Sequence, residues 1–213
     1  MRQEPLPRGL PAPLPEGERL LWQGRPTVMG LARRAFHVDL VAAYFALLAL
    51  WGTAAGTGPA GARLAGVAAT LEIGAAALAI LVGLAWLSAR TTTYTLTDRR
   101  VLLQIGIALS LTVNLPLREI EGAALRRFGD GTGDVPLRLR AGTRLAYLHL
   151  WPHARPWRLS RPEPLLRSLP DAAVLATRLA AALAAAHGQA PQAVAAADAA
   201  PDLPGRLAAA HPV

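Results

Sequence analysis

Cysteine and lysine are both absent from this chain of 213 residues. Without cysteine the chain has no disulfide bonds, no thiolate metal ligands and no cysteine nucleophile. Without lysine, arginine supplies all 22 basic side chains, which we attribute to a coding bias rather than to function. The 14 acidic residues leave a net charge of +8. Because no nucleic-acid-binding motif accompanies this charge, we expect membrane lipid, and no nucleic acid, as its partner.

Two long apolar runs, residues 36–55 and 64–87, stand in the first half of the chain. At about 1.5 Å per helical residue each run is roughly 30 Å long, which is the hydrocarbon thickness of a bilayer. A short loop rich in glycine, proline and alanine joins them. We therefore predict a transmembrane helical hairpin over residues 35–88.

Arginine side chains are distributed unevenly around this hairpin. Arg33 and Arg34 precede the first run and Arg90 follows the second, whereas Arg63 is the only charge in the loop. By the positive-inside rule both ends of the hairpin face the cytoplasm. We therefore expect a multi-pass protein of the bacterial inner membrane with both termini in the cytoplasm.

The second apolar run is rich in alanine and glycine and contains one carboxylate, Glu72. Small residues let helices approach closely, either within the hairpin or with a partner, and a homodimer is one arrangement this permits. A carboxylate inside a membrane is costly. Glu72 is therefore either protonated or snorkelling, or it contacts another membrane subunit, and we keep it as a partner-binding candidate.

After residue 91 the long apolar runs end, and apolar and polar residues alternate. The odd positions from Val101 to Leu117 are all apolar, and polar residues occupy several even positions. A period of two predicts half-buried strands, with a break near Gly106, rather than a third membrane helix. Further elements are expected as strands over 118–127, 135–141 and 144–150, and as a helix over 171–186.

These elements divide the chain into four parts: a Pro-rich segment (1–34) partly packed on the soluble domain, the hairpin (35–88), the domain (89–187) and a disordered Ala/Pro-rich tail (188–213). The predicted fold class is α+β. A transmembrane two-helix hairpin carries a cytoplasmic antiparallel β-sheet or barrel, and a C-terminal α-helix caps the sheet.

Tryptophan marks two short stretches that have candidate binding roles. Trp22 is expected in a short strand or turn packed on the domain, or alternatively at the membrane interface. The stretch 151–157 contains Trp151, His153, Arg155 and Trp157. It is either a proline-stiffened loop whose indoles cap the sheet or a docking surface, since tryptophan and arginine dominate interface energetics.

Catalytic and metal-binding patterns are missing from the sequence. No histidine pair has metal-ligand spacing, and no Ser-His-Asp arrangement or carboxylate pair stands out, so we expect no enzyme activity and no metal site. The stretch Gly129–Asp134 lacks the features of a phosphate loop or an EF-hand and is predicted to be a hairpin turn. His37 is the one candidate ligand for a bacteriochlorophyll magnesium, against the interpretation of an interfacial or hydrogen-bonded histidine.

Several motifs together resemble a known family. The segments PEGERLLWQGRP (15–26), TTYTLTDRRV (92–101) and NLPLREI (114–120), in this order around a hairpin, resemble the bacterial pleckstrin-homology-like membrane proteins. The segments WPHARPW (151–157) and LRSLPD (166–171) are similar to those of the photosynthetic complex assembly proteins of purple phototrophic bacteria.

This resemblance implies a pleckstrin-homology-like (PH-like) β-barrel capped by a C-terminal helix. It also implies an assembly factor for the photosynthetic reaction centre and its core antenna, light-harvesting complex 1. Subunits of both would be partners, with the reaction-centre H subunit among the expected contacts. From the residues themselves we expect no cofactor, with bacteriochlorophyll as the one alternative. The alternative is a membrane-anchored PH-like module that binds lipid or bacteriochlorophyll.

Overall fold

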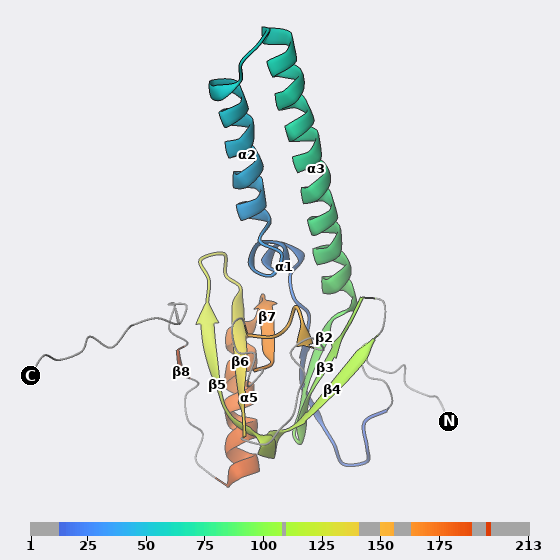
Figure 1. The fold of residues 1–213 in the computed structure, drawn as a ribbon. Helices are drawn as coiled ribbons and strands as arrows, with labels where there is room; N and C mark the ends of the chain where they lie inside the picture. The colour runs from blue at the N-terminus through green and yellow to red at the C-terminus, as the bar shows by residue number, and fades with distance from the viewer. Residues whose placement is uncertain (1–12, 108–109, 141–149, 156–162, 189–194, 197–213) are drawn as a thin grey trace, which may run out of the picture.

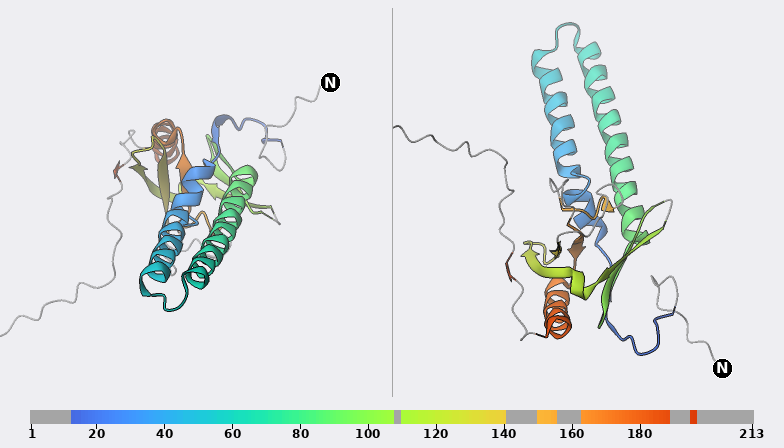
Figure 2. Two further views of the ribbon diagram at one scale, coloured as in Figure 1. Left: turned by 90° about the horizontal axis from the view of Figure 1, so that it is seen from above. Right: turned by 60° about the horizontal axis from the view of Figure 1, so that its bottom comes forward.

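A computed structural model describes residues 13–107, 110–140, 150–155, 163–188 and 195–196 of the chain. Two long helices project as a hairpin from one end of a domain that is built from two four-stranded sheets and a helix (Figures 1 and 2). A short helix lies between the hairpin and the domain, where it contacts both.

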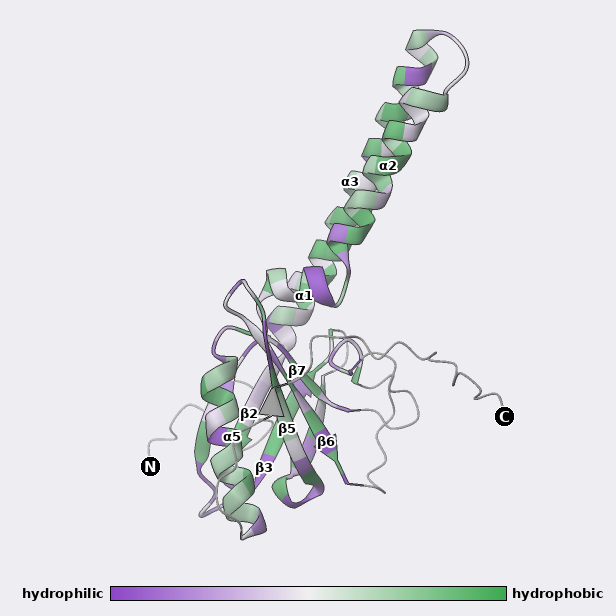
Figure 3. Cartoon of the chain, turned by 90° about the vertical axis from the view of Figure 1, so that its left-hand side faces the viewer, coloured by the Kyte–Doolittle hydropathy of each residue, from purple (hydrophilic) through white to green (hydrophobic). Residues whose placement is uncertain are grey.

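The hairpin consists of α2 (Val38–Ala55) and α3 (Ala60–Thr91), which confirms the predicted pair of helices. Both are long and apolar enough to cross a membrane, and only 6% of the most apolar window of each is buried. Figure 3 shows these two helices, whose residues are largely hydrophobic, standing clear of the domain. Helix α3 is longer than the predicted 64–87, because helical structure continues into flanks whose polar residues end the apolar run.

The contact between the two helices depends on a glycine. A Cβ atom added to Gly74 would lie 2.8 Å from Cγ of Phe45, so the α2 ring packs directly on the α3 backbone. By contrast, an added Cβ at Gly66 or Gly83 would meet nothing within 4 Å. The small residues of α3 are therefore used on one face and left open on another.

Helix α1 (Val28–Arg34) was not predicted, because seven residues are too few for a clear helical period. The Thr27 hydroxyl caps its start by accepting a hydrogen bond from the Gly30 N–H, at 3.3 Å. Its buried residue Leu31 packs in one apolar cluster with Ala85 and Ala89 of α3. The N-terminal segment therefore joins the base of the hairpin as well as the domain.

The first sheet has the order β1-β2-β3-β4 and is antiparallel. Its strands are β1 (Leu20–Gly24), β2 (Thr93–Thr97), β3 (Arg100–Ile105) and β4 (Leu111–Pro116). The strands β3 and β4 confirm the prediction from alternation, including the break after residue 105. Strand β1 precedes the hairpin in the chain and β2 follows it, so the hairpin is an insertion between two paired strands.

The second sheet has the order β7-β6-β5-β8. A 3₁₀ turn, η1 (Leu117–Glu119), leads into β5 (Ile120–Arg127), β6 (Gly133–Leu139), β7 (Leu165–Leu169) and β8 (Ala195–Ala196). Strand β7 was not predicted, and all five of its residues are buried. The tail prediction needs one correction, since two of its residues pair with β5. The predicted strand 144–150 and the rest of the tail lie outside the described residues, except Leu150, which is buried, and Gly188, the C-cap of the last helix.

Helix α5 (Ala172–His187) confirms the predicted C-terminal helix. It contacts β5 and β6 of the second sheet, the η1 turn, and β1 at the edge of the first sheet. Its residues Leu175, Leu179 and Leu183 join the main core between the sheets. Apart from the parallel pair of β8 with β5, the described strands and this helix agree with the predicted antiparallel sheet capped by a helix.

Candidate functional site

An arginine at the end of α1 ties the base of the hairpin to the second sheet. The Arg34 guanidinium donates to Oδ2 of Asp130 at 2.5 Å and to the Thr132 hydroxyl at 2.9 Å. It also lies 3.6 Å from the centroid of the Phe128 ring and donates to the Ser168 hydroxyl at 3.4 Å. We name these five residues the Arg34 latch. The turn after β5 therefore confirms the hairpin prediction and serves to hold an arginine.

The latch carboxylate is held in its charged form. Hydrogen bonds from the Thr132 hydroxyl and N–H, with a further one from Arg34, lower the pKa of Asp130 to about 2. The neighbouring Asp134 is different, because burial raises its pKa although its Oδ1 accepts a 2.7 Å hydrogen bond from the Ser168 N–H. The charged contact between α1 and the domain thus persists at all pH values near neutrality.

Beside the latch lies a fully buried polar cluster around His153. The Tyr94 hydroxyl accepts a hydrogen bond from the Arg167 N–H at 3.3 Å, so its own proton is available for Nδ1 of His153 at 2.6 Å. Nε2 of His153 then carries the ring proton and donates to the Thr92 hydroxyl at 3.1 Å. We infer this tautomer from the network, since each ring nitrogen has one partner.

The burial of His153 corrects its prediction as a docking residue. A side chain with no exposed surface cannot touch a partner, and its two ring nitrogens are both used internally. Burial, and then the nearby Arg167 charge, lower the pKa of the imidazole to about 3. Burial also raises the pKa of Tyr94. The cluster therefore stays neutral and fixes the 150–155 segment against β2 and β7.

The other candidates of that stretch have different surroundings. Trp151 is 51% exposed, and its ring lies edge-on to Phe36 with the centroids 5.7 Å apart. Arg155 is partly exposed and pairs with Glu163 at 2.9 Å. Trp157 lies outside the described residues. Trp151 and Arg155 therefore remain available at the surface, whereas His153 does not.

Trp22 is buried in the domain, which confirms its prediction in a strand and excludes the membrane interface for its ring. Its Nε1–H donates to Oδ2 of Asp171 at 2.7 Å. Asp171 is the residue before α5, and its carboxylate makes this contact rather than capping the helix. Trp22 joins the N-terminal segment to the last helix and has no surface for a partner.

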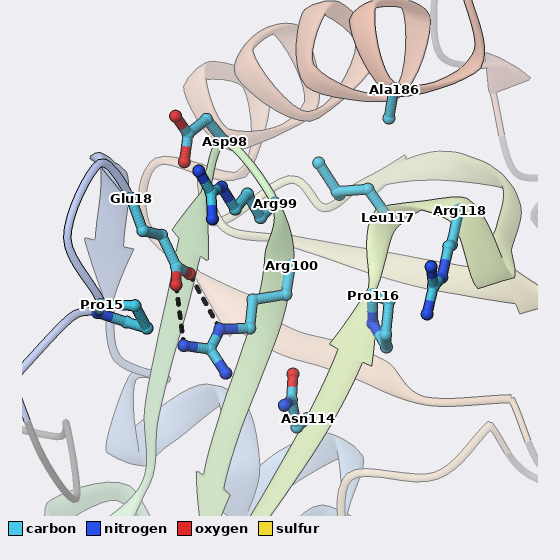
Figure 4. A pocket seen from close by; sticks show the side chains of 10 residues that line it. All are labelled: Pro15, Glu18, Asp98, Arg99, Arg100, Asn114, Pro116, Leu117, Arg118 and Ala186. Atoms are coloured by element: carbon cyan, nitrogen blue, oxygen red, sulfur yellow. Dashed lines mark hydrogen bonds and ion pairs between the residues drawn. The ribbon is translucent and has the colours of Figure 1, made fainter.

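At the end of the domain away from the hairpin, a shallow pocket of about 520 Å³ surrounds Glu18 and Arg100 (Figure 4). Nε and Nη2 of Arg100 each donate to Glu18 at 2.8 Å, and the Thr97 hydroxyl donates to Glu18 at 2.7 Å. Burial opposes ionisation of Glu18, but the Arg100 and Thr97 hydrogen bonds outweigh it and lower its pKa. The motifs around residues 18 and 100 thus have a structural role, because they bind the N-terminal segment to β2 and β3.

A protein-family model described as a bacterial PH domain matches residues 40–183. The chain belongs to the bacterial PH domain family. The match begins inside α2 and ends inside α5, so the hairpin is part of what this bacterial PH domain shares with its family. An uncharacterized 23.7 kDa protein in the puhA 5' region of Rhodobacter capsulatus is 41% identical over 197 residues, which are 91% of each chain. No solved structure matches the chain.

On the hairpin of this PH domain protein, Glu72 is exposed, as are Gly66 and Gly83 on the same helix. No side-chain partner of Glu72 occurs among the described residues. His37 is also exposed; it precedes α2 in a left-handed backbone conformation with φ of 52°. Its carbonyl accepts hydrogen bonds from the first turn of α2, so its imidazole remains free of a capping role.

Within the described ranges no group of three or more histidine, aspartate or glutamate residues is arranged to hold a metal ion. Sequence reasoning missed the Arg34 latch entirely. The only signal was the pair of acidic residues in the turn 129–134, which were assigned to turn chemistry alone. Their pairing with Arg34, about a hundred residues earlier in the chain, follows from the position of α1 and has no local pattern.

Proposed function

We propose that this bacterial PH domain protein is a non-enzymatic assembly factor, of the PuhB type, for the photosynthetic reaction centre and core light-harvesting complex 1 of a purple phototrophic bacterium. The observation that carries the proposal is the 41% identical relative, which is described as lying in the puhA 5' region and thus beside a photosynthesis gene. The motif resemblance at 151–157 and 166–171 agrees with this.

In the proposed arrangement the hairpin crosses the inner membrane and both termini lie in the cytoplasm. Strands β1 and β2 are hydrogen-bonded partners that stand on either side of the hairpin in the sequence. The two ends of the hairpin must therefore lie on the same side of the membrane, which requires an even number of crossings. Arg33, Arg34 and Arg90 at these ends favour the cytoplasmic side.

We propose that client subunits bind the open face of α3. Glu72 is exposed, and Gly83, about three turns further on the same face, has nothing within 4 Å of an added Cβ, so a partner helix has close access to the backbone there. A carboxylate in hydrocarbon favours a polar partner over lipid. Reaction-centre subunits, including the H subunit, and light-harvesting 1 components are the proposed clients, and Arg155 is a further contact candidate on the domain.

One observation favours a second function, as a PH-like module that binds lipid or bacteriochlorophyll. The His37 imidazole is exposed at the first turn of α2, where it is free to ligate a pigment magnesium. In this case bacteriochlorophyll would purify with the protein at a fixed ratio, and the pigment would be lost from a His37→Ala variant that is still inserted in the membrane.

The proposed function is tested by the near-infrared absorption of membranes from a strain that lacks the gene. We expect depleted reaction-centre and core-antenna bands with pigment synthesis intact, and full recovery with the wild-type gene. Complementation with Glu72→Leu should recover less than complementation with Ile73→Leu, a matched change of an exposed neighbour. Glu72→Gln separates the need for a polar group from the need for charge.

An unchanged spectrum in the deletion strain would refute the assembly function. Full recovery by Glu72→Leu would leave the assembly function in place but remove Glu72 from the client surface. Equal amounts of each variant in the membrane, measured by immunoblot, make the comparison valid.

A further inference from the structure

The packing of α1 on α3 fixes the level at which α1 would lie relative to the membrane. Its residue Leu31 shares an apolar cluster with Ala85 and Ala89, which stand near the end of α3 that enters the domain. The same turn of α3 carries Trp86, 49% exposed, and Arg90, whose guanidinium lies 5.2 Å from the Trp86 ring centroid. If the hairpin spans the membrane, α1 lies at the level where aromatic and cationic side chains meet lipid headgroups.

Large apolar groups are exposed at this same level. Met29 of α1 is 57% exposed and Trp151 is 51% exposed. Trp151 contacts Phe36, which stands two residues before the start of α2, so its ring also lies at the base of the hairpin. The side chain of Arg33, 51% exposed, lies one helical turn after Met29 and forms an exposed ion pair with Asp39 at 3.5 Å. Apolar and aromatic groups mixed with arginine are typical of surfaces in the interfacial layer.

We infer that α1 and Trp151 form a lipid-binding face that lies in the cytoplasmic headgroup layer and contacts anionic phospholipid. This inference rests on the proposed membrane insertion of the hairpin, but not on the photosynthetic role. The face is continuous with the lipid-exposed surface of α2 and α3, which favours lipid over a protein partner. It also assigns Trp151 to the membrane instead of to a client docking surface.

The face is held in place by the domain. The Arg34 latch fixes the end of α1 to the second sheet, and the buried His153 cluster fixes the segment that carries Trp151. Both lipid-contacting groups are thus rigid relative to the hairpin, and little conformational entropy is lost when they enter the headgroup layer.

The test uses the absence of cysteine from the chain. Single cysteines replace Met29, Trp151, Leu48 and Leu20 in the full chain, and each carries an environment-sensitive nitrobenzoxadiazole label. The proteins are reconstituted in vesicles of phosphatidylcholine and phosphatidylglycerol that contain a phosphatidylcholine with a nitroxide near its headgroup, which reports on Met29, Trp151 and Leu20, or, in a parallel set, deep in its acyl chain, which reports on Leu48. Leu48 lies on α2 and reports hairpin insertion, whereas Leu20, 41% exposed, pairs with Thr97 at the far end of the domain.

We expect nitroxide quenching and blue-shifted emission at Met29, Trp151 and Leu48, with neither at Leu20. Quenching at Leu48 but not at Met29 and Trp151 would overturn the lipid-binding face and leave the inserted hairpin intact. Equal quenching at Leu20 would overturn it as well, because the whole domain would then lie on lipid. No quenching at Leu48 would refute membrane insertion, and the inference with it. If Trp151→Cys does not fold, the Met29 label decides the outcome.

Discussion

Acidification should destabilise the domain through His153, and the effect has a defined sign. The folded pKa, about 3, lies below the ordinary value of 6.5 because the imidazole is buried. Above the ordinary value the ring is neutral in both states. Below pH 6.5, His153 is protonated in the unfolded chain but stays neutral in the folded protein. The free energy of unfolding therefore falls as pH falls from about 6.5 to about 3.

The magnitude follows from the linkage between proton binding and folding. When the unfolded chain binds one proton more than the folded protein, the free energy of unfolding changes by about 1.4 kcal/mol per pH unit. This difference exists only below the ordinary pKa of 6.5, so a step from about pH 7.5 to about pH 5 lowers the free energy of unfolding by about 2 kcal/mol. Glu18 and Asp130, whose folded pKa values are lowered, add losses mainly at lower pH. Asp134, whose folded pKa is raised, contributes with the opposite sign.

The assay compares wild type with His153→Gln, whose amide has an NH₂ donor group and a carbonyl acceptor but does not titrate. Urea unfolding of the full chain in non-ionic detergent, followed through tryptophan emission, gives the free energy of unfolding at each pH. We expect the wild type to lose about 2 kcal/mol more than the variant across this pH step. The carboxylates cancel in the difference, and equal pH slopes for the two proteins would refute the assignment of a neutral, buried His153.

Two further predictions concern the Arg34 latch at the base of the hairpin and the contact between the two hairpin helices. Arg34→Ala should lower the free energy of unfolding by about 1–2 kcal/mol and speed amide exchange in α1 and in the turn after β5, whereas Arg33→Ala, which breaks a more exposed pair, should do less. Similar exchange in both variants would contradict the latch. Gly74→Ala should loosen the hairpin by about 1–3 kcal/mol because of the Phe45 contact, whereas Gly83→Ala should not. Equal thermal stability of these two glycine variants in detergent would contradict the helix contact.

Much of the fold could be predicted because the deciding patterns are local. Long apolar runs located the hairpin, and the alternation from Val101 to Leu117 located β3 and β4. Turn residues located the β5–β6 connection, and the C-terminal helix followed from its period. Each of these signals depends on neighbours within a few residues in the sequence.

The missed features depend on contacts between distant segments. Helix α1 is too short for a periodic signal and is stable because Leu31 packs on α3. Strand β7 was not predicted because it is buried on both faces and so lacks the alternation of a half-buried strand. It also contains Arg167, a residue type that is rare in a core. The burial of His153 depends on Thr92 and Tyr94, about sixty residues earlier. No local pattern separates such a histidine from one on a surface.

The pairing of β1 with β2 has a consequence for biosynthesis. Strand β1 leaves the ribosome first, but its partner appears only after both hairpin helices have been made and turned back. Until then Trp22 has no core to enter and Glu18 has no arginine to bind. A hairpin inserted with its ends on opposite sides would keep β1 from β2 permanently. If the hairpin spans the membrane as proposed, the domain can fold only when both hairpin ends lie on one side, and a chain inserted otherwise would stay unfolded and open to cellular proteases.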